Sequence, residues 1–393
     1  MDKSVGSFSY DSRLGESSLG RSQYFVFLLL GFYFIVPHHL FFQIIDFREI
    51  KPFDLVVPMM LAFYLTKKIS FRGLSPLLLL IGLYLLRSFF AVGDIGSITI
   101  VYALKLFEYL VVIFCLKDLR PIFINRLVVV YIFAIAVYVV AELLGVEFGL
   151  GWGGRLSGQF GGPYEFSSIA LLLFLYLGRG IAGRVAFFTM IILSGTKAAY
   201  LALVAGLVVN MKPRYSVLTI IFIFFIFFVA MATDERFSIF VSNLATLGGL
   251  DIFEILYSIP KVESHDEYIQ TFMVRESSTN EELDLSTGTR LYTYLLILKS
   301  MDLNAFFIGH GPGFFGKGVD SSILRIFGEV GVLGLILGYQ VMKVLCKDLG
   351  GSRSNLVILI VMVAFSDVFF SARFLPTLFL LNQYAFFKLH QNS

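Results

Sequence analysis

Apolar residues follow one another along this chain in long stretches that short polar turns interrupt. Many of the stretches approach the ~20 residues that a helix needs to cross a lipid bilayer. Bounded by their polar and glycine ends, the predicted spans are 24–44, 50–66, 74–92, 98–116, 122–146, 164–178, 183–195, 196–210, 215–232, 322–345, 354–372 and 374–390. The pattern therefore predicts an all-α, polytopic integral membrane protein with about twelve transmembrane helices.

The composition supports this class. Of the 393 residues, 57% are hydrophobic, only 15% are charged, and 44 are phenylalanine. A soluble domain of this length needs more polar surface. A soluble enzyme or a nucleic-acid-binding protein is thereby excluded.

The positions of lysine and arginine predict the orientation, because cytoplasmic loops carry the excess of both. The basic residues assigned to the cytoplasm are Lys3, Arg13, Arg21, Lys67, Lys68, Arg72, Lys117, Arg120, Arg126, Arg179, Arg184, Lys212, Arg214, Lys347 and Arg353. Both termini are then cytoplasmic. The expected order is a tail over 1–23, nine helices within 24–232, an outer loop over 233–321, and three helices within 322–393.

The outer loop is acidic, with eleven Asp and Glu residues against three basic ones over 233–289. One interpretation is a solvated loop. The apolar spacing of 250–257 also suits an amphipathic helix that lies on the outer membrane face.

Several ionisable residues fall inside or beside the spans, and this topology places them at one depth near the outer face. They are Arg87, Lys105, Glu108, Glu142, Arg155, Glu165, Lys197, Arg290, Asp367 and Arg373. Buried charges in membranes pair with one another or mark a functional site. Arg87, Lys105 and Glu108 fit a structural ion-pair network equally well, whereas the whole set suits a polyanionic lipid headgroup such as a diphosphate.

Two glycine-rich segments accompany these charges. The first surrounds Arg155 over 151–162 and leads into Pro163, and the second runs over 309–313 around His310. Backbone without side chains can approach an anion closely, although glycine-rich segments are also ordinary turns. The chain has no His, Cys and carboxylate spacing typical of a metal site, and its two cysteines, near cytoplasmic span ends, predict no disulfide.

The order of these motifs resembles the O-antigen polymerase and ligase superfamily of bacterial inner membranes. The matching elements are the arginine–glycine loop from Arg155 to Pro163, the turn from Leu193 to Tyr200, Gly-Thr-Arg at 288–290, the glycine motif at 309–313 and the helix start at 329–334. The likeness covers about 150–340. The first 150 residues are similar only in being membrane spans.

The resemblance implies a GT-C-like glycosyltransferase that acts on undecaprenyl-diphosphate-linked oligosaccharides at the periplasmic face of the inner membrane. A hydroxyl of one lipid-linked repeat unit would attack the growing glycan, and undecaprenyl diphosphate would leave. No metal, cofactor or nucleic acid is expected, while the bilayer and a chain-length regulator protein are expected partners. Diphosphate binding would fall to Arg155, Lys197 and Arg290, with Arg87 and Lys105 as further cations.

The candidates for the general base are Glu142, Glu165, His310 and Asp320, and the sequence does not choose between them. Together with Arg155 and Arg290 they are the candidate catalytic residues. Ligases of the superfamily resemble one another in a His-Asn pair after the glycine motif, where this chain has Asp320, so a polymerase is favoured. Lys197 stands where the family usually has arginine, which leaves the role of that turn open. The alternatives are a ligase and a flippase or other transporter.

Overall fold

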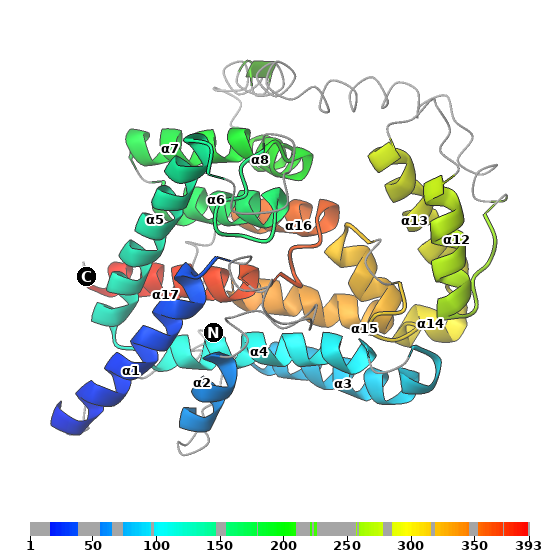
Figure 1. Ribbon diagram of the computed structural model, residues 1–393, viewed down its shortest axis with the longest axis horizontal. Coiled ribbons are helices and arrows are strands. Elements are labelled where there is room, and N and C mark those ends of the chain that lie inside the picture. The colour runs from blue at the N-terminus through cyan, green and yellow to red at the C-terminus, as the bar shows by residue number, and fades with distance from the viewer. Residues whose placement is uncertain are drawn as a thin grey trace, which may run out of the picture.

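The computed structural model describes residues 16–37, 56–64, 74–95, 98–146, 155–178, 180–209, 259–277, 285–315, 319–345, 353–371 and 373–391, with isolated positions at 221, 224–225 and 257. The described part is all-α, with fourteen helices (Figure 1). They are α1 (Glu16–Ile35), α2 (Val56–Tyr64), α3 (Ser75–Ile95), α4 (Ile98–Asp118), α5 (Pro121–Leu143), α6 (Pro163–Leu177), α7 (Ile181–Ser194), α8 (Lys197–Val209), α12 (His265–Ser277), α13 (Leu285–Ser300), α14 (Leu303–Ile308), α15 (Ser322–Leu345), α16 (Arg353–Phe365) and α17 (Phe374–Gln391).

Local sequence explains where several helices begin and end. α5 and α6 each start with proline, whose missing N–H and fixed φ suit the first helical position. Asp302 caps α14 by accepting a hydrogen bond from the Ala305 N–H at 2.6 Å. α7 ends at Gly195, which takes up the left-handed conformation with φ of 58°.

Three of the described helices are long and apolar enough to cross a membrane. They are Ser75–Gly93 within α3, Pro121–Leu143, and Ser322–Leu345. Shorter apolar helices cover Ser22–Ile35, Pro163–Leu177, Ile181–Ser194, Lys197–Gly206 and Asn355–Phe365. These helices suggest a membrane protein, while the count of twelve spans stays a prediction, and most of the predicted span 215–232 lies outside the described residues.

The helices pack in neighbouring sets around one large core. α3 lies beside α4 and α15, α6 beside α7 and α17, and α8 beside α16 (Figure 1). The core draws on α1 to α8 and on α15 to α17, with Leu30, Ile113, Leu172 and Leu380 fully buried. This packing brings distant parts of the chain, such as α4 and α17, into contact.

The predicted outer loop contains helices of its own. α12, α13 and α14 lie together at the right-hand end in Figure 1, and a second core beneath them includes Tyr268, Leu296 and Phe315. Ala91 and Ile95, from the end of α3, join this second core. Of the predicted amphipathic helix at 250–257, only Tyr257 belongs to the described part, so that prediction and the domain limits remain untested.

Candidate functional site

The first glycine segment forms a loop over residues 155–162, here called the glycine loop, which a carboxylate holds at its centre. Glu142, in the last turn of α5, accepts hydrogen bonds from the N–H groups of Ser157 at 3.0 Å and Gly158 at 2.6 Å. Gly158 has a φ of +55°, a conformation that glycine adopts without strain. Glu142 thus fixes the path of the loop.

A second carboxylate holds the end of the glycine loop where α6 begins. Glu165 accepts from the Gly161 N–H at 2.9 Å and from the Ser371 hydroxyl at 2.9 Å. The fully buried Arg373 donates to the Gln159 carbonyl at 2.8 Å and to the Val36 carbonyl. The loop is therefore tied to α1 and to the start of α17.

The turn between α7 and α8 lies against the glycine loop. The Leu156 N–H donates to the Leu193 carbonyl at 3.1 Å. Lys197 follows Gly195 and opens α8, and its side chain is half-buried. Two of the sequence motifs, far apart in the chain, are thus neighbours in the fold.

Two arginines and an acidic residue meet around Tyr164, at the start of α6; we call Arg155, Tyr164, Arg290 and Asp320 the arginine cluster. The Arg290 Nε–H donates to Asp320 at 2.6 Å, and its Nη2–H donates to the Tyr164 hydroxyl oxygen at 2.5 Å. The guanidinium carbons of Arg155 and Arg290 lie 5.9 and 5.6 Å from the centre of the Tyr164 ring. This distance is within the range of a cation–π interaction.

The surroundings of Arg290 keep its charge. Burial lowers the pKa of the guanidinium, but the adjacent Tyr164 and Asp320 more than reverse this effect and raise the pKa above its ordinary value. The side chain of Arg290 is 21% exposed and that of Asp320 is 44% exposed. The cluster therefore offers a permanent cation and a carboxylate that solvent reaches.

The second glycine segment packs backbone to backbone against α15. The N–H groups of His310 and Gly311 donate to the carbonyls of Gly328 and Glu329 at 2.8 and 2.9 Å. Gly331 interrupts α15 with a φ of +68°, where the segment approaches. Arg87, from α3, donates to the Gly309 carbonyl at 2.6 Å.

The His310 ring is enclosed rather than open. Its ring stacks on Phe314 with centres 4.5 Å apart, and its Nε2 lies 3.1 Å from the Ser300 carbonyl. A carbonyl only accepts, so Nε2 carries the proton in the neutral ring. Burial lowers the pKa of His310, which keeps the ring neutral at neutral pH.

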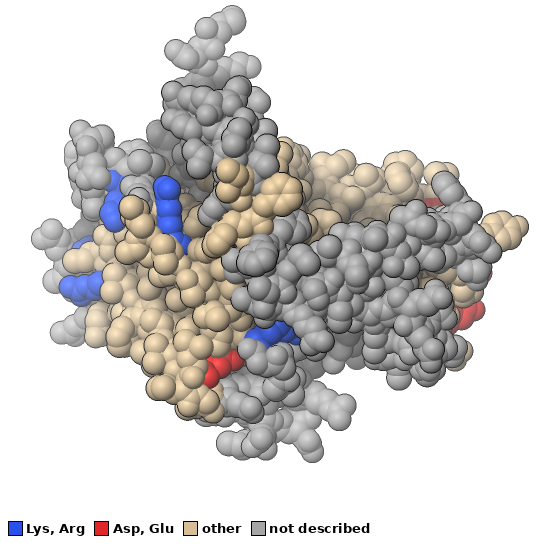
Figure 2. All heavy atoms as spheres, turned by 90° about the horizontal axis from the view of Figure 1, so that it is seen from above, with Lys and Arg blue, Asp and Glu red and all other residues tan. Residues whose placement is uncertain are grey.

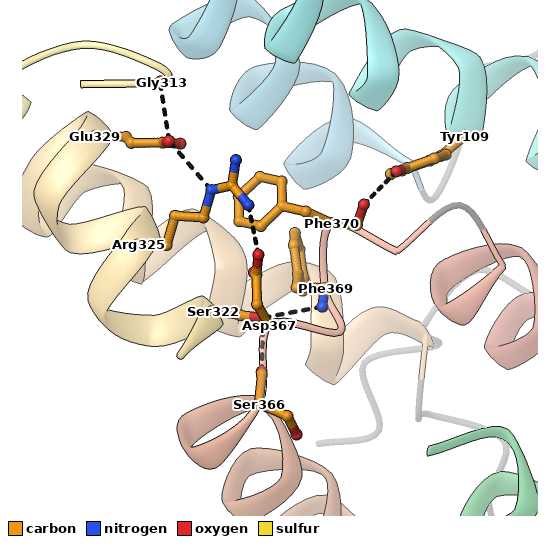
Figure 3. Close-up of polar contacts among 9 residues, drawn as sticks. All are labelled: Tyr109, Gly313, Ser322, Arg325, Glu329, Ser366, Asp367, Phe369 and Phe370. Carbon is orange, nitrogen blue, oxygen red and sulfur yellow. Dashed lines mark hydrogen bonds and ion pairs between the residues drawn. The ribbon is translucent and has the colours of Figure 1, made fainter. Parts of the chain in front are cut away.

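Figure 3 shows a buried ion network between α15 and the connection from α16 to α17. Arg325 bonds to Glu329 at 3.2 Å and to Asp367 at 2.5 Å, and it lies over the Phe370 ring at 4.6 Å. Glu329 also accepts from the Gly313 N–H at 2.9 Å. The network therefore joins the second glycine segment to the segment that also supplies Ser371.

Ser322 extends this network towards the arginine cluster. Its hydroxyl lies 3.2 Å from an Asp367 oxygen and donates to the Ser366 carbonyl at 3.0 Å. Asp320, which pairs with Arg290, lies two residues earlier in the chain. The buried ion network thus anchors the segment that carries Asp320.

The predicted site residues fall into separate groups. Arg155, Arg290 and Asp320 come together, whereas Glu142 and Glu165 both bind backbone N–H groups of the glycine loop. The other predicted residues lie elsewhere: Arg87 and His310 at the second glycine segment, Lys197 at the start of α8, and Lys105 in α4 with a side chain outside the described part. Their catalytic and binding roles stay predictions.

Sequence reasoning missed Tyr164 and Arg325. Tyr164 follows Pro163 at a helix start, where an aromatic residue gives no special signal. Arg325 lies within an apolar stretch four residues before Glu329, and this charge inside a predicted span could have indicated the pair.

The described residues contain no group of three His, Cys, Asp or Glu side chains that could hold a metal ion. Figure 2 shows a mostly uncharged described surface, with most of the visible Lys and Arg towards the left-hand end and with carboxylates both at the right-hand end and beside a basic residue in the lower left-centre. Comparison with protein families and with curated proteins found no match for this chain. The resemblance therefore rests on the sequence motifs alone.

Proposed function

We propose that the protein is a membrane glycosyltransferase that polymerises polysaccharide repeat units, with the arginine cluster as its active site. The observation that carries the proposal is the convergence of Arg155, Arg290 and Asp320 around Tyr164. Arg155 and Arg290 come from two of the sequence motifs that resemble the O-antigen polymerase and ligase superfamily, and Asp320 follows the glycine motif at 309–313. Two cations beside a carboxylate suit a reaction in which a diphosphate leaves while a hydroxyl loses its proton.

In the proposed reaction, an acceptor hydroxyl oxygen on one lipid-linked repeat unit forms a bond to the anomeric carbon of the growing glycan. The bond from that carbon to undecaprenyl diphosphate breaks, and the diphosphate leaves with the electron pair. Arg155 and Arg290 stabilise the negative charge that develops on the diphosphate. A preorganised cation near a developing charge lowers the barrier without further rearrangement.

Asp320 is the base that this geometry favours, and it takes the hydroxyl proton. Its carboxylate is partly exposed and adjoins Arg290, whereas Glu142 and Glu165 are occupied by loop N–H groups. His310 belongs to the second glycine segment, where its ring stacks on Phe314, and not to the arginine cluster. A base must lie within hydrogen-bond reach of the proton that it removes, and Asp320 adjoins the cations that would hold the donor.

The finer topology belongs to the same proposal. It comprises about twelve spans in a bacterial inner membrane, both termini in the cytoplasm, and the arginine cluster on the periplasmic side. The support for this orientation is the excess of lysine and arginine in the loops assigned to the cytoplasm. A chain-length regulator protein is the expected partner of such a polymerase.

The test replaces Arg290 in a host strain that lacks the native gene. Arg290→Ala should abolish long polysaccharide chains, and Arg290→Lys should restore little, because lysine cannot reproduce the planar fork that contacts both Tyr164 and Asp320. Arg155→Ala should leave single lipid-linked repeats accumulating. The readouts are the polysaccharide banding on a gel and the protein level in the membrane fraction.

Arg126→Ala, in α5, is the matched control, because it removes an arginine outside the arginine cluster. Full-length polymer from Arg290→Ala at normal protein level would rule out the proposed role of Arg290. Polymer of normal length from Arg155→Ala would show that Arg155 is not needed for polymerisation and that the glycine loop has a structural role only.

A further inference from the structure

Tyr164 is the common contact of the two arginines in the arginine cluster. It is the second residue of α6, and its side chain is half-buried. The Tyr164 hydroxyl binds Arg290, while the ring lies within cation–π range of both guanidinium groups. One aromatic side chain thus touches two cations from distant parts of the sequence.

The ring limits how far the two cations can be separated. Both guanidinium carbons lie within 5.9 Å of one ring centre, so they are at most twice that distance apart. Like charges repel each other, and the Asp320 carboxylate is paired with only one of the two, Arg290. The electron-rich ring face and the phenolic oxygen offset part of that repulsion.

The backbone around Tyr164 makes its position firm. The preceding proline fixes the start of α6, and the Tyr164 carbonyl accepts hydrogen bonds from the Ser167 and Ser168 hydroxyls at 3.0 and 2.6 Å. Glu165, the next residue, is buried and binds both the glycine loop and Ser371. The ring therefore stands on a rigid part of the fold, as a site that must hold two side chains in place requires.

A diphosphate has two anionic phosphoryl groups, one for each of the two cations that contact the Tyr164 ring. Arginine binds such groups through paired N–H donors at ~2.7–2.9 Å. On the basis of the proposed function, we propose that Tyr164 is a positioning residue that holds Arg155 and Arg290 together as one clamp for a diphosphate. The clamp acts on the headgroup that every lipid-linked donor shares, whatever its sugar.

The test measures binding of farnesyl diphosphate to the purified full-length protein in nanodiscs. Tyr164→Phe keeps the ring and loses the hydroxyl contact, so its affinity for farnesyl diphosphate should fall about fivefold. Tyr164→Leu loses both the ring and the hydroxyl, so its affinity should fall about fiftyfold. Tyr131→Phe is the matched control, because it removes a buried hydroxyl that contacts Thr377 instead. The control should bind like the wild type.

A double-mutant comparison separates positioning from general structural damage. In a background that carries both Arg155→Ala and Arg290→Ala, Tyr164→Leu should cause no further loss of affinity, since there are no guanidinium groups to hold. Unchanged affinity in Tyr164→Leu, or an equal loss with and without the arginines, would overturn the proposal. The thermal unfolding midpoints of all variants are measured alongside. A Tyr164→Phe protein with wild-type stability shows that its loss of affinity does not come from unfolding.

The same variants are assayed for polymer in cells, which separates this proposal from the function. If farnesyl diphosphate binding depends on Tyr164 while polymer length changes in none of the variants, the positioning role of Tyr164 is supported and the polymerase function is contradicted. If Arg290→Ala abolishes polymer while Tyr164→Leu leaves both binding and polymer intact, the positioning role fails and the function stands.

Discussion

Gly309 and Gly331 permit the closest backbone approach between the second glycine segment and α15. A Cβ atom built on Gly309 would lie 2.2 Å from the Glu329 carbonyl carbon, and one on Gly331 would lie 2.3 Å from that of Phe307. Both residues also have φ near +70°, which side chains disfavour. At these two positions the absence of a side chain is a condition of the fold.

We predict that Gly309→Ala destabilises the protein by about 3 kcal/mol or more, because the new methyl group meets backbone and the positive φ adds strain. Gly82→Ala is the matched control in α3, where a Cβ meets nothing within 4 Å. It should stabilise the helix by about 0.5–1 kcal/mol. Thermal unfolding in detergent measures both, and a Gly309→Ala protein as stable as the wild type would contradict the packing described.

At the scale of elements, the buried ion network fixes α15 to the connection between α16 and α17. The side chains of Arg325 and Glu329 are 8% and 1% exposed, so each charge depends on its partner rather than on water. Gly313 supplies a further hydrogen bond to Glu329, and the Ser322 hydroxyl lies 3.2 Å from an Asp367 oxygen. Through these contacts one short connection orders both the second glycine segment and the segment that carries Asp320.

Arg325→Met should destabilise the protein by about 3–5 kcal/mol, because the buried Glu329 and the partly buried Asp367 both lose their counter-charge. Adding Glu329→Gln and Asp367→Asn removes both charges while keeping oxygen acceptors for Gly313 and Ser322. This triple variant should recover most of the lost stability. Protease resistance and thermal unfolding rank the stabilities of the wild type, Arg325→Met and the triple variant. A triple variant less stable than Arg325→Met would show that the network contributes little through charge.

Across the whole molecule, acidic α12 and the helices beside it form one end, from which α3 and α15 run towards the middle, while the third long apolar helix, α5, lies at the other end (Figure 1). The arginine cluster joins the first turn of α6 to α13 and to the start of α15. If the proposed function and topology hold, this site lies at headgroup depth, where it would meet lipid-linked substrates. A polymerase and a ligase would both use this arrangement, so their products must separate them.

His310→Ala distinguishes these two functions. Its stacked, carbonyl-bonded ring predicts at most partial shortening of the polysaccharide ladder, and a stability loss of about 1–2 kcal/mol. A ligase that relies on a histidine base would instead lose all attached polysaccharide while lipid-linked polymer accumulates. If the protein is a polymerase, a strain that lacks the whole gene should keep the single-repeat band. Loss of that band, with lipid-linked polymer still present, would favour the ligase.

The sequence alone predicts the membrane class and the apolar helices, because a bilayer selects for long apolar stretches that can be counted along the chain, but it predicts none of α12, α13 and α14. It also marks Arg155, Arg290 and Asp320 as candidates, since charge and glycine are conspicuous in apolar surroundings. The same reasoning leaves the number of spans open, because several helices are too short to count by length.

Only the tertiary structure decides which of these residues meet. Tyr164 and Arg290 are 126 residues apart, and Arg325 and Asp367 are 42 apart, so no local pattern connects them. From the sequence, Glu142, Glu165 and Asp320 are equal candidates for the base. In the fold, the two glutamates bind the glycine loop, while Asp320 pairs with Arg290. The physical reason is that hydropathy depends on each residue's own side chain, whereas a polar cluster depends on how whole helices pack against one another.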